Sequence, residues 1–286
     1  CQQRLEGEGG MWLRMADGVN ASFNRNARHD AAQSIVTGTV GYTTTAKEVY
    51  ATDRLTGHGF AVGDALSIHG ATNYGWNGVY LVRSVIDANS FTVQLYGKPT
   101  DANPAGAIAV SRANKFITLC GAGEINVNGT GQTVSGSPET FGINFVNVYR
   151  PTCRDLKLTR GKKYVINFAR CAYSTVADIE LDTDSDGVHW QGGAWGVHVS
   201  NISGKSGDDF VGFTGGDYSY YTQGKGDFDG IVIDGLFPRS CIYAVKFTGN
   251  DQHRYGNVSV SNVSGVADHG AIFAQNDTDQ DSVRMD

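Results

Sequence analysis

Three aspartates recur at a spacing that can bring their carboxylates together. The segments 162–166, 185–189 and 208–212 begin 23 residues apart, with Asp186 and Asp209 at equivalent positions and Asp208 one residue before Asp209. A repeat of this length puts residues that are distant in sequence side by side in space. Neighbouring carboxylates are the groups that acid/base cleavage of a glycosidic bond requires. We therefore predict that Asp186, Asp208 and Asp209 are catalytic.

A turn is the simpler explanation of any single Asp-Gly or Gly-Asp-Asp sequence, because aspartate and glycine favour turns. The columns of the repeat argue for more than turns. Two positions after the acidic column, every residue is small and apolar, which is typical of a core. This apolar column consists of Val165, Val188, Val211, Val245 and Ala271. Stacked carboxylates cannot all ionise at low cost, so we expect at least one aspartate with a raised pKa.

The elements that must position these residues are short strands. The chain has 286 residues with 38 glycines and 5 prolines, and it lacks long segments of helical periodicity. Apolar residues in alternating segments recur in steps of 23, 23, 34 and 27 residues, at Leu156, Ile179, Ile202, Leu236 and Val263. Such units without helix predict an all-β, right-handed parallel β-helix. The step of 34 predicts a loop of about ten extra residues over 215–227.

A different texture interrupts this pattern. Residues 48–96 alternate between short apolar runs and turn sequences, which predicts a small antiparallel β module inserted into the β-helix. The β-helix would begin in residues 1–47 and resume after the module over 97–286. Residues 97–114 would be the linker that leads back from the module. The module resembles one found in phage structural and adhesion proteins, with the pattern G-H-G-F-x-V-G-D, N-G-V-Y-x-V and F-T-V. It would serve as a spacer or trimer contact, or bind glycan through Tyr74, Trp76 and Tyr80.

Composition excludes some classes of function. The net charge of −6 argues against nucleic-acid binding, which depends on neutralising phosphates. No apolar run approaches the roughly 18 residues of a membrane span, so we expect no membrane partner. The five cysteines lack C-x-x-C spacing and predict buried free thiols. Residues 182–187 open like a calcium loop, but the twelfth position is Gly193 rather than glutamate. We predict no metal and no cofactor.

Other residues are candidates for substrate binding. His189 and Lys246 share a column that would flank the carboxylates. Trp195, Tyr218 and Tyr220 fall in turn or insertion segments, where exposed rings can stack on the C–H face of a sugar. Trp190 aligns with Phe213, Phe247 and Phe273, so we assign it to the core.

The central segment resembles polygalacturonase-type glycoside hydrolases. Asp184-Ser185-Asp186-Gly187-Val188, a strand, and then Gly207-Asp208-Asp209-Phe210-Val211 are similar to the N-T-D-G and G-D-D motifs of that family. The resemblance implies that Asp186 and Asp209 hold the attacking water, that Asp208 is the general acid, and that configuration is inverted. Three departures stand out. Asp184 replaces the asparagine, the G-H-G histidine has no counterpart, and R-I-K becomes Ala244-Val245-Lys246.

More broadly, residues 115–275 resemble the pectin-lyase-like β-helix of phage tailspike depolymerases, as in the sequences 207–218 and 244–249. This resemblance implies a homotrimer in the virion tail, outside the cell. Its partners would be a bacterial surface polysaccharide, either capsule or O-antigen, and other phage tail proteins. Because the final coil of a solenoid needs a cap, we expect the chain to be a fragment that continues beyond Asp286.

Two alternatives to hydrolysis remain open. The first is a polysaccharide lyase, in which Lys163 or Lys246 acts as the base and the aspartates hold calcium. The second is a non-catalytic adhesin, in which the aspartates form turns or accept hydrogen bonds from sugar.

Overall fold

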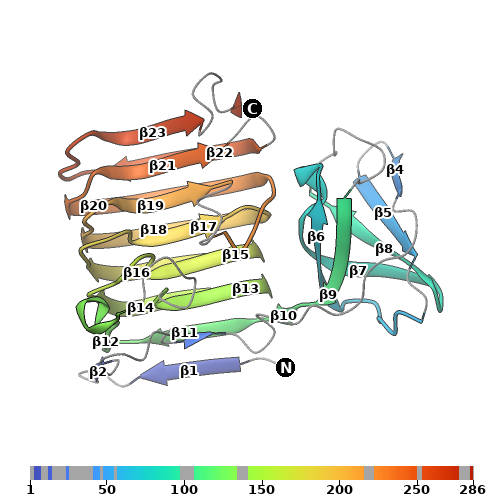
Figure 1. Cartoon of the computed structure of the whole chain (residues 1–286), viewed down its shortest axis with the longest axis horizontal. Coiled ribbons are helices and arrows are strands. Elements are labelled where there is room, and N and C mark those ends of the chain that lie inside the picture. The colour runs from blue at the N-terminus through green and yellow to red at the C-terminus, as the bar shows by residue number, and fades with distance from the viewer. Residues whose placement is uncertain are drawn as a thin grey trace.

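A ladder of parallel strands forms one body of the computed structural model, and a small antiparallel sheet lies beside it (Figure 1). The structure describes residues 3–7, 12–14, 24–25, 41–45, 48–54, 57–96, 106–133, 141–215, 222–249, 253–276 and 284–285. Each ladder strand pairs in parallel with the equivalent strand of the next coil. This confirms the predicted all-β fold, a parallel β-helix with an additional antiparallel sheet.

Two ladders run along the β-helix. The first ladder consists of β13 (Ile143–Tyr149), β15 (Ile166–Ala172), β17 (Val188–Gln191), β19 (Asp209–Thr214), β21 (Tyr243–Gly249) and β23 (Gly270–Asn276). The second consists of β14 (Thr152–Thr159), β16 (Thr175–Asp182), β18 (Ala194–Lys205), β20 (Phe228–Ser240) and β22 (Arg254–Val263). Shorter strands extend the coils at either end: β1 (Gln3–Gly7), β2 (Trp12–Arg14), β3 (Asn24–Arg25), β10 (Asn114–Lys115), β11 (Ile117–Gly121), β12 (Glu124–Asn126) and β24 (Arg284–Met285).

The register of the second ladder is the predicted one. Leu156, Ile179, Ile202, Leu236 and Val263 pair in succession through the five strands. Their side chains repeat on the inner face, so each coil buries its apolar residues against the next.

The first ladder agrees with prediction only in its middle. Val188, Val211 and Val245 form a column as expected, but Ile166 precedes them instead of Val165, and Ile272 follows instead of Ala271. Val165 and Ile166 both donate their N–H groups to the carbonyl of Gly187, at 3.1 and 3.2 Å. This irregularity absorbs one residue, so the step between β15 and β17 is one residue shorter than the repeat.

Aromatic rings form the centre of the core along the first ladder. Neighbouring ring centroids are 5.2, 4.9, 5.0 and 5.1 Å apart through the stack Phe145, Phe168, Trp190, Phe213 and Phe247. These separations follow the spacing of paired strands. Burying each such side chain contributes about 1.5 to 3 kcal/mol. The stack confirms that Trp190 belongs to the core, whereas Ala274 takes the position predicted for Phe273.

Single left-handed residues bend the strands of the second ladder. Their φ angles are 58°, 55°, 53°, 87° and 54° at Asp155, Asp178, Asn201, Gly235 and Asn262. Glycine, asparagine and aspartate adopt this conformation at the lowest cost. The amide of Asn201 also donates to the Asp178 carboxylate at 3.1 Å. The abundance of these residue types therefore reflects the corners of the coils.

The inserted module is larger than predicted. It contains β4 (Gly41–Thr45), β5 (Glu48–Arg54), β6 (Ala65–Ala71), β7 (Gly78–Asp87), β8 (Ser90–Leu95) and β9 (Gly106–Arg112), joined in one antiparallel sheet. A short 3₁₀ turn, η1 (Tyr74–Trp76), links β6 to β7, and another, η2 (Gly129–Gly131), lies in the β-helix. The sheet spans 41–112 rather than 48–96, because β9 pairs with β6 from within the stretch expected to be a linker.

Two of the three side chains considered for glycan binding form the interior of this module instead. Trp76 and Tyr80 are fully buried, and Tyr74 lies on the His253 ring of the β-helix, with ring centroids 4.5 Å apart. Glycan binding through Trp76 and Tyr80 is therefore wrong, whereas Tyr74 is partly exposed and its contact with glycan stays a prediction. The module packs closely on the β-helix, where the Ser67 hydroxyl donates to the Asn147 side chain at 2.9 Å.

Two further expectations concern thiols and membranes. Cys120, Cys153, Cys171 and Cys241 are buried and free, as predicted, and Cys1 lies outside the described residues. Within the described ranges, no helix has the length and apolar character needed to cross a membrane.

Candidate active site

The turns that precede β17 and β19 present the three aspartates. Asp209 is the first residue of β19, Asp208 lies directly before it, and Asp186 lies two residues before β17. Two glycines allow these turns to approach. A Cβ atom on Gly187 would lie 2.4 Å from the Phe210 carbonyl, and one on Gly207 would lie 2.3 Å from the Asp184 carbonyl. Glycine at these positions therefore sets the spacing of the aspartates.

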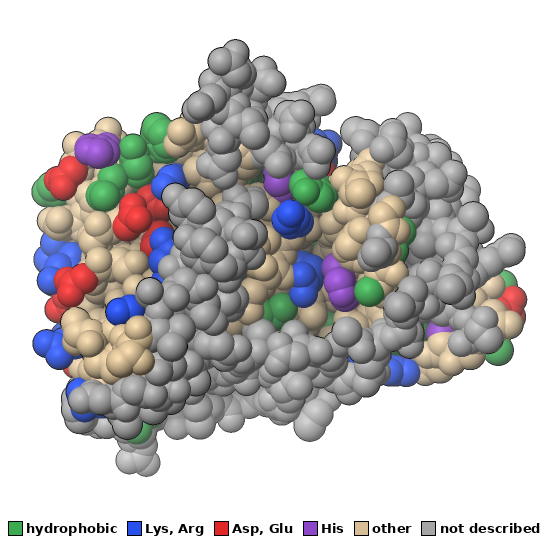
Figure 2. Space-filling view, viewed as in Figure 1, with side chains coloured by type: hydrophobic (Ala, Val, Ile, Leu, Met, Phe, Trp, Pro, Cys, Tyr) green, Lys and Arg blue, Asp and Glu red, His purple; other side chains and the backbone are tan. Residues whose placement is uncertain are grey.

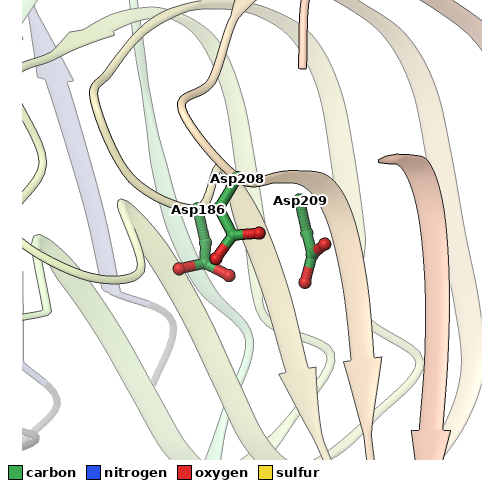
Figure 3. A group of neighbouring side chains, drawn as sticks. All are labelled: Asp186, Asp208 and Asp209. Atoms are coloured by element: carbon green, nitrogen blue, oxygen red, sulfur yellow. The ribbon is translucent and has the colours of Figure 1, made fainter. Parts of the chain in front are cut away.

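The predicted grouping of the carboxylates is present. One oxygen from each of Asp186, Asp208 and Asp209 lies within 4.8 Å of the others. Figure 3 shows the three side chains pointing the same way from neighbouring turns. Asp186 and Asp209 are buried, at 2% and 4% exposure, whereas Asp208 is partly exposed. Asp208 is thus the most accessible of the three carboxyl groups.

Two lysines hold the buried carboxylates. Lys163 Nζ lies 2.8 Å from Asp186 Oδ2, which also accepts from the Ser185 hydroxyl at 3.2 Å. Lys246 Nζ lies 3.2 Å from Asp209 Oδ2. The sequence predicted Lys246 beside the carboxylates and offered Lys163 only as an alternative base of a lyase. It gave no indication that each lysine would pair with a different aspartate.

Burial and mutual repulsion shift the protonation of this cluster. Burial, followed by the charge of Asp186, raises the pKa of Asp209 to about 7, although Lys246 opposes the rise. The same two causes raise the pKa of Asp208. Burial alone would lower the pKa of Lys246, but the three carboxylates raise it above its ordinary value. The expectation that at least one aspartate has a raised pKa is confirmed.

His189 lies beside the carboxylates, in register with Lys246 through Gly212. Its ring stacks on Tyr164 with centroids 3.7 Å apart, and Nε2 lies 2.7 Å from the Thr214 hydroxyl. Burial, and then the charges of Lys163 and Lys246, hold the pKa of His189 well below its usual range. The imidazole is therefore neutral at pH 7, and its role in substrate binding stays a prediction.

These residues line one pocket of about 520 Å³. Besides the carboxylates, the two lysines and His189, its walls include Tyr164, Thr214, Thr248 and Gln275. Sequence analysis missed these four. Thr214, Thr248 and Gln275 form one outward column, two positions after the column of His189 and Lys246, so the register contained a usable signal. Acidic side chains, with basic ones among them, gather on the side of the β-helix remote from the module, and further basic side chains lie between the β-helix and the module (Figure 2).

The aromatic side chains predicted to bind substrate do not line this pocket in the described part of the chain. Trp195 is only 2% exposed, and its ring lies 5.4 Å from that of Tyr96 in the contact between module and β-helix. Its predicted contact with sugar is wrong, because Trp195 lies at the start of β18 rather than in a turn, and the module covers it there. Tyr218 and Tyr220 lie outside the described residues.

The carboxylate cluster has the composition of a cation site, because three acidic oxygens converge within 4.8 Å. Ammonium groups of Lys163 and Lys246 already contact two of the three carboxylates. Their positive charge opposes a divalent cation at the same oxygens. These side chains therefore fit a shared proton better than a metal ion.

Comparison with known proteins assigns no function to this pocket. No protein-family model matches the chain, and no curated protein matches it significantly. The functional argument therefore depends on the geometry and charge of the site.

Proposed function

We propose that the protein hydrolyses glycosidic bonds in a bacterial surface polysaccharide, as a tailspike depolymerase does. One observation supports this above others: two neighbouring turns bring three carboxylates within 4.8 Å in a pocket of about 520 Å³. Glycoside hydrolysis needs one carboxyl group that keeps its proton and another that is ionised. A buried cluster with raised pKa values meets that need.

Asp208 is the proposed general acid. Its side chain is partly exposed, so a leaving oxygen can reach it, and burial and the charge of Asp186 raise its pKa, which favours the protonated form that a general acid needs. Asp186 and Asp209 are buried and held by Lys163 and Lys246, which suits them to orient and activate water. Carboxyl groups this close titrate as a unit, so the proton belongs to the cluster as a whole.

Hydrolysis explains the lysines better than β-elimination does. A lyase needs a base with a lowered pKa to remove a proton next to a uronate. The pKa of Lys246 is raised, and Lys163 is tied to Asp186 at 2.8 Å. Both ammonium groups are therefore stabilised as cations. Products that absorb in the ultraviolet through a new double bond would instead establish the lyase.

An adhesin is the remaining alternative, and the contacts of the aspartates argue against it. Carboxylates that serve only as turn formers accept hydrogen bonds from nearby backbone N–H groups. The described partners of Asp186 are Lys163 and the Ser185 hydroxyl, and the described partner of Asp209 is Lys246. The cluster thus resembles a charged site more than a turn.

The stereochemical outcome is an open part of the proposal. The resemblance implies inversion, for which carboxyl groups are typically about 6.5 to 9.5 Å apart, against about 5 to 5.5 Å for retention. The nearest oxygens of the three carboxylates lie within 4.8 Å of one another, which is shorter than either range. Proton NMR of the anomer formed first decides between the two.

The assembly and location of the protein also belong to the proposal. We propose a homotrimer in a virion tail, attached to other tail proteins and acting outside the cell. Light scattering of the purified protein tests the trimer. A monomer that cleaves polysaccharide would contradict the trimer and leave the chemistry intact.

The decisive experiment compares Asp208→Asn with the unsubstituted protein on a panel of capsular and O-antigen polysaccharides, with detection of new reducing ends. Removal of a general acid should lower kcat by about 10² to 10⁴. Asp182→Asn is the matched control, because Asp182 pairs with Lys205 on the solvated second ladder. Unchanged cleavage by the Asp208 variant would refute its role. Absence of cleavage by every form on every polysaccharide would support the adhesin.

A further inference from the structure

A second pocket lies between the inserted module and the β-helix. Its volume is about 460 Å³, and its walls come from both bodies. The module contributes His69, Tyr74 and Asn77, and the β-helix contributes Arg170, Gln223 and Lys225. This pocket is separate from the carboxylate pocket and has the opposite charge.

Arg170 provides the positive charge inside this pocket. Its Nε donates to the Asn147 side chain at 2.7 Å, and one terminal nitrogen donates to the Gln223 carbonyl. Both partners are neutral, and no carboxylate pairs with Arg170 in the part of the chain that the structure describes. A guanidinium has five N–H donors, so most of its capacity is left for a ligand.

Burial makes this cation an effective anion-binding group. Arg170 is half-buried, and burial lowers its pKa to about 10, so the side chain is charged at pH 7 and only partly solvated. Burial, and then the charge of Arg170, lowers the pKa of His69 to about 4, which leaves the imidazole neutral. A buried charge is costly unless it is paired. A bound oxyanion would supply the missing partner, with exposed Lys225 adding a second positive charge.

Hydrogen bonds and backbone contacts hold the groups of the pocket in place. Asn147 orients Arg170 and is itself fixed by the hydroxyl of Ser67 in the module, at 2.9 Å. The segment that contains Gly224 lies directly on the β-helix, since a Cβ atom on Gly224 would be 2.7 Å from the Gly192 carbonyl. Preorganised donors lose little freedom on binding, which favours affinity.

The position of this pocket relates it to the carboxylate site. His189 pairs with Asn167 in β15, and Arg170 follows Asn167 by three residues, roughly 10 Å along the strand. Gln223 lies between the two sites: its side chain accepts from Asn167 at 3.1 Å, and its carbonyl accepts from Arg170. An extended glycan that crosses Gln223 reaches both.

We propose that the Arg170 pocket binds the carboxylate or phosphate group of an acidic residue in the glycan. The guanidinium matches the two oxygens of such a group in a two-pronged arrangement. The identity of the anion's carrier rests on the proposed function, whereas binding of the anion itself does not. The inference assigns an acidic polysaccharide as the substrate class.

Calorimetry with inorganic phosphate, D-glucuronate and neutral D-glucose tests the anion site. We expect the two anions to bind and glucose not to bind. Arg170→Gln should weaken anion binding roughly ten- to hundredfold. Lys225→Gln, at an exposed position, should weaken it less, and Asp208→Asn should leave it unchanged. Equal anion binding by Arg170→Gln and the unsubstituted protein would overturn the proposal.

A measurement on the unsubstituted protein covers the case in which Arg170→Gln does not fold. Phosphate bound beside His69 should raise the pKa of its imidazole, which NMR detects as a shift of the ring titration to higher pH. A His69 titration that saturating phosphate leaves unchanged would overturn the site.

A glycan experiment separates the two proposals. An acidic polysaccharide and its carboxyl-reduced form are compared for binding to Asp208→Asn, with and without Arg170→Gln. Preference for the acidic form that Arg170→Gln abolishes is the expected result. Equal binding of both forms would overturn the glycan as carrier of the anion. Anion binding without any cleavage would leave the pocket intact and remove the hydrolase.

Discussion

The two ladders of the β-helix carry similar charge pairs in very different surroundings. On the first ladder and the turns before it, Lys163 pairs with Asp186 and Lys246 with Asp209, in a pocket of about 520 Å³. On the second ladder, Lys157 Nζ lies 3.5 Å from Glu180 Oε1, beside a groove of about 490 Å³. Both sets join neighbouring coils, and both hollows have nearly the same volume.

Exposure separates the two. The carboxylate side chains of Asp186 and Asp209 are 3% and 5% exposed, whereas that of Glu180 is 41% exposed. Water screens the exposed Lys157–Glu180 pair, so this pair contributes little to the free energy of unfolding. Exclusion of water strengthens the same interaction and shifts pKa values. Stacked charges in a solenoid therefore become chemically useful only where neighbouring groups bury them.

The largest expected difference is in catalysis. Asp209→Asn should lower kcat by about 10² to 10⁴ on a polysaccharide that the protein cleaves, because it removes a water-activating carboxylate. Glu180→Gln, the matched change beside the groove of the second ladder, should leave kcat unchanged. Reducing-end assays measure both. Equal losses in the two variants would show that burial does not distinguish the two hollows.

Stability should change in the opposite direction from activity. The pKa of Asp209 is about 7 in the folded protein, against about 3.9 for an aspartate in an unfolded chain. The folded state therefore binds more protons between these pH values, and stability falls as pH rises through them. Asparagine does not ionise, so Asp209→Asn should be more stable by about 1 to 3 kcal/mol at pH 8, with the gain vanishing towards pH 4. Urea unfolding at both pH values checks this, and a gain independent of pH would contradict it.

Removal of Lys246 should move the pH profile. Its charge opposes the raised pKa of both Asp208 and Asp209. In Lys246→Met both values rise, so the alkaline limb of kcat/KM should move up by about one pH unit. Lys157→Met is the control on the exposed side. If the alkaline limb of kcat/KM in Lys246→Met moved to lower pH instead, Asp208 would be excluded as the group that must hold a proton.

The smallest effect is expected at the exposed pairs. Lys205 Nζ lies 3.1 Å from Asp182 Oδ1, and both side chains are more than two-fifths exposed. Lys205→Gln should change the free energy of unfolding by less than about 1 kcal/mol. Denaturant titration in low and high salt measures it. A loss of several kcal/mol would mean that the exposed ladder is energetically closer to the buried one than its solvation indicates.

Sequence analysis recovered the second ladder completely and the first ladder in part. Leu156, Ile179 and Ile202 could be aligned because alternating apolar residues mark the inner face of each strand. The shortened step at Ile166 could not be predicted, because it results from two N–H groups sharing the Gly187 carbonyl. Local backbone irregularities of this kind leave no trace in hydrophobic periodicity.

The site was predicted as a set of residues, but its protonation was not. The spacing of Asp186, Asp208 and Asp209 indicates proximity, and proximity alone predicts that some pKa rises. Which carboxyl is most affected depends on burial by segments remote in sequence. The predicted sugar contact of Trp195 was wrong for the same reason. The sequence does not reveal that the inserted module, which is remote from Trp195 in the chain, covers its side chain.

The pairing of β1 with β11 has a consequence for how the chain reaches its folded state. Gln3 is in register with Ile117, more than a hundred residues later, and the module lies between them in sequence. During synthesis β1 cannot pair with β11 until the module has emerged, so contacts of high sequence separation would slow their docking. Closing a flexible loop of that length is entropically costly. A module that folds early shortens the effective loop between β1 and β11, so it would speed the docking of these two strands.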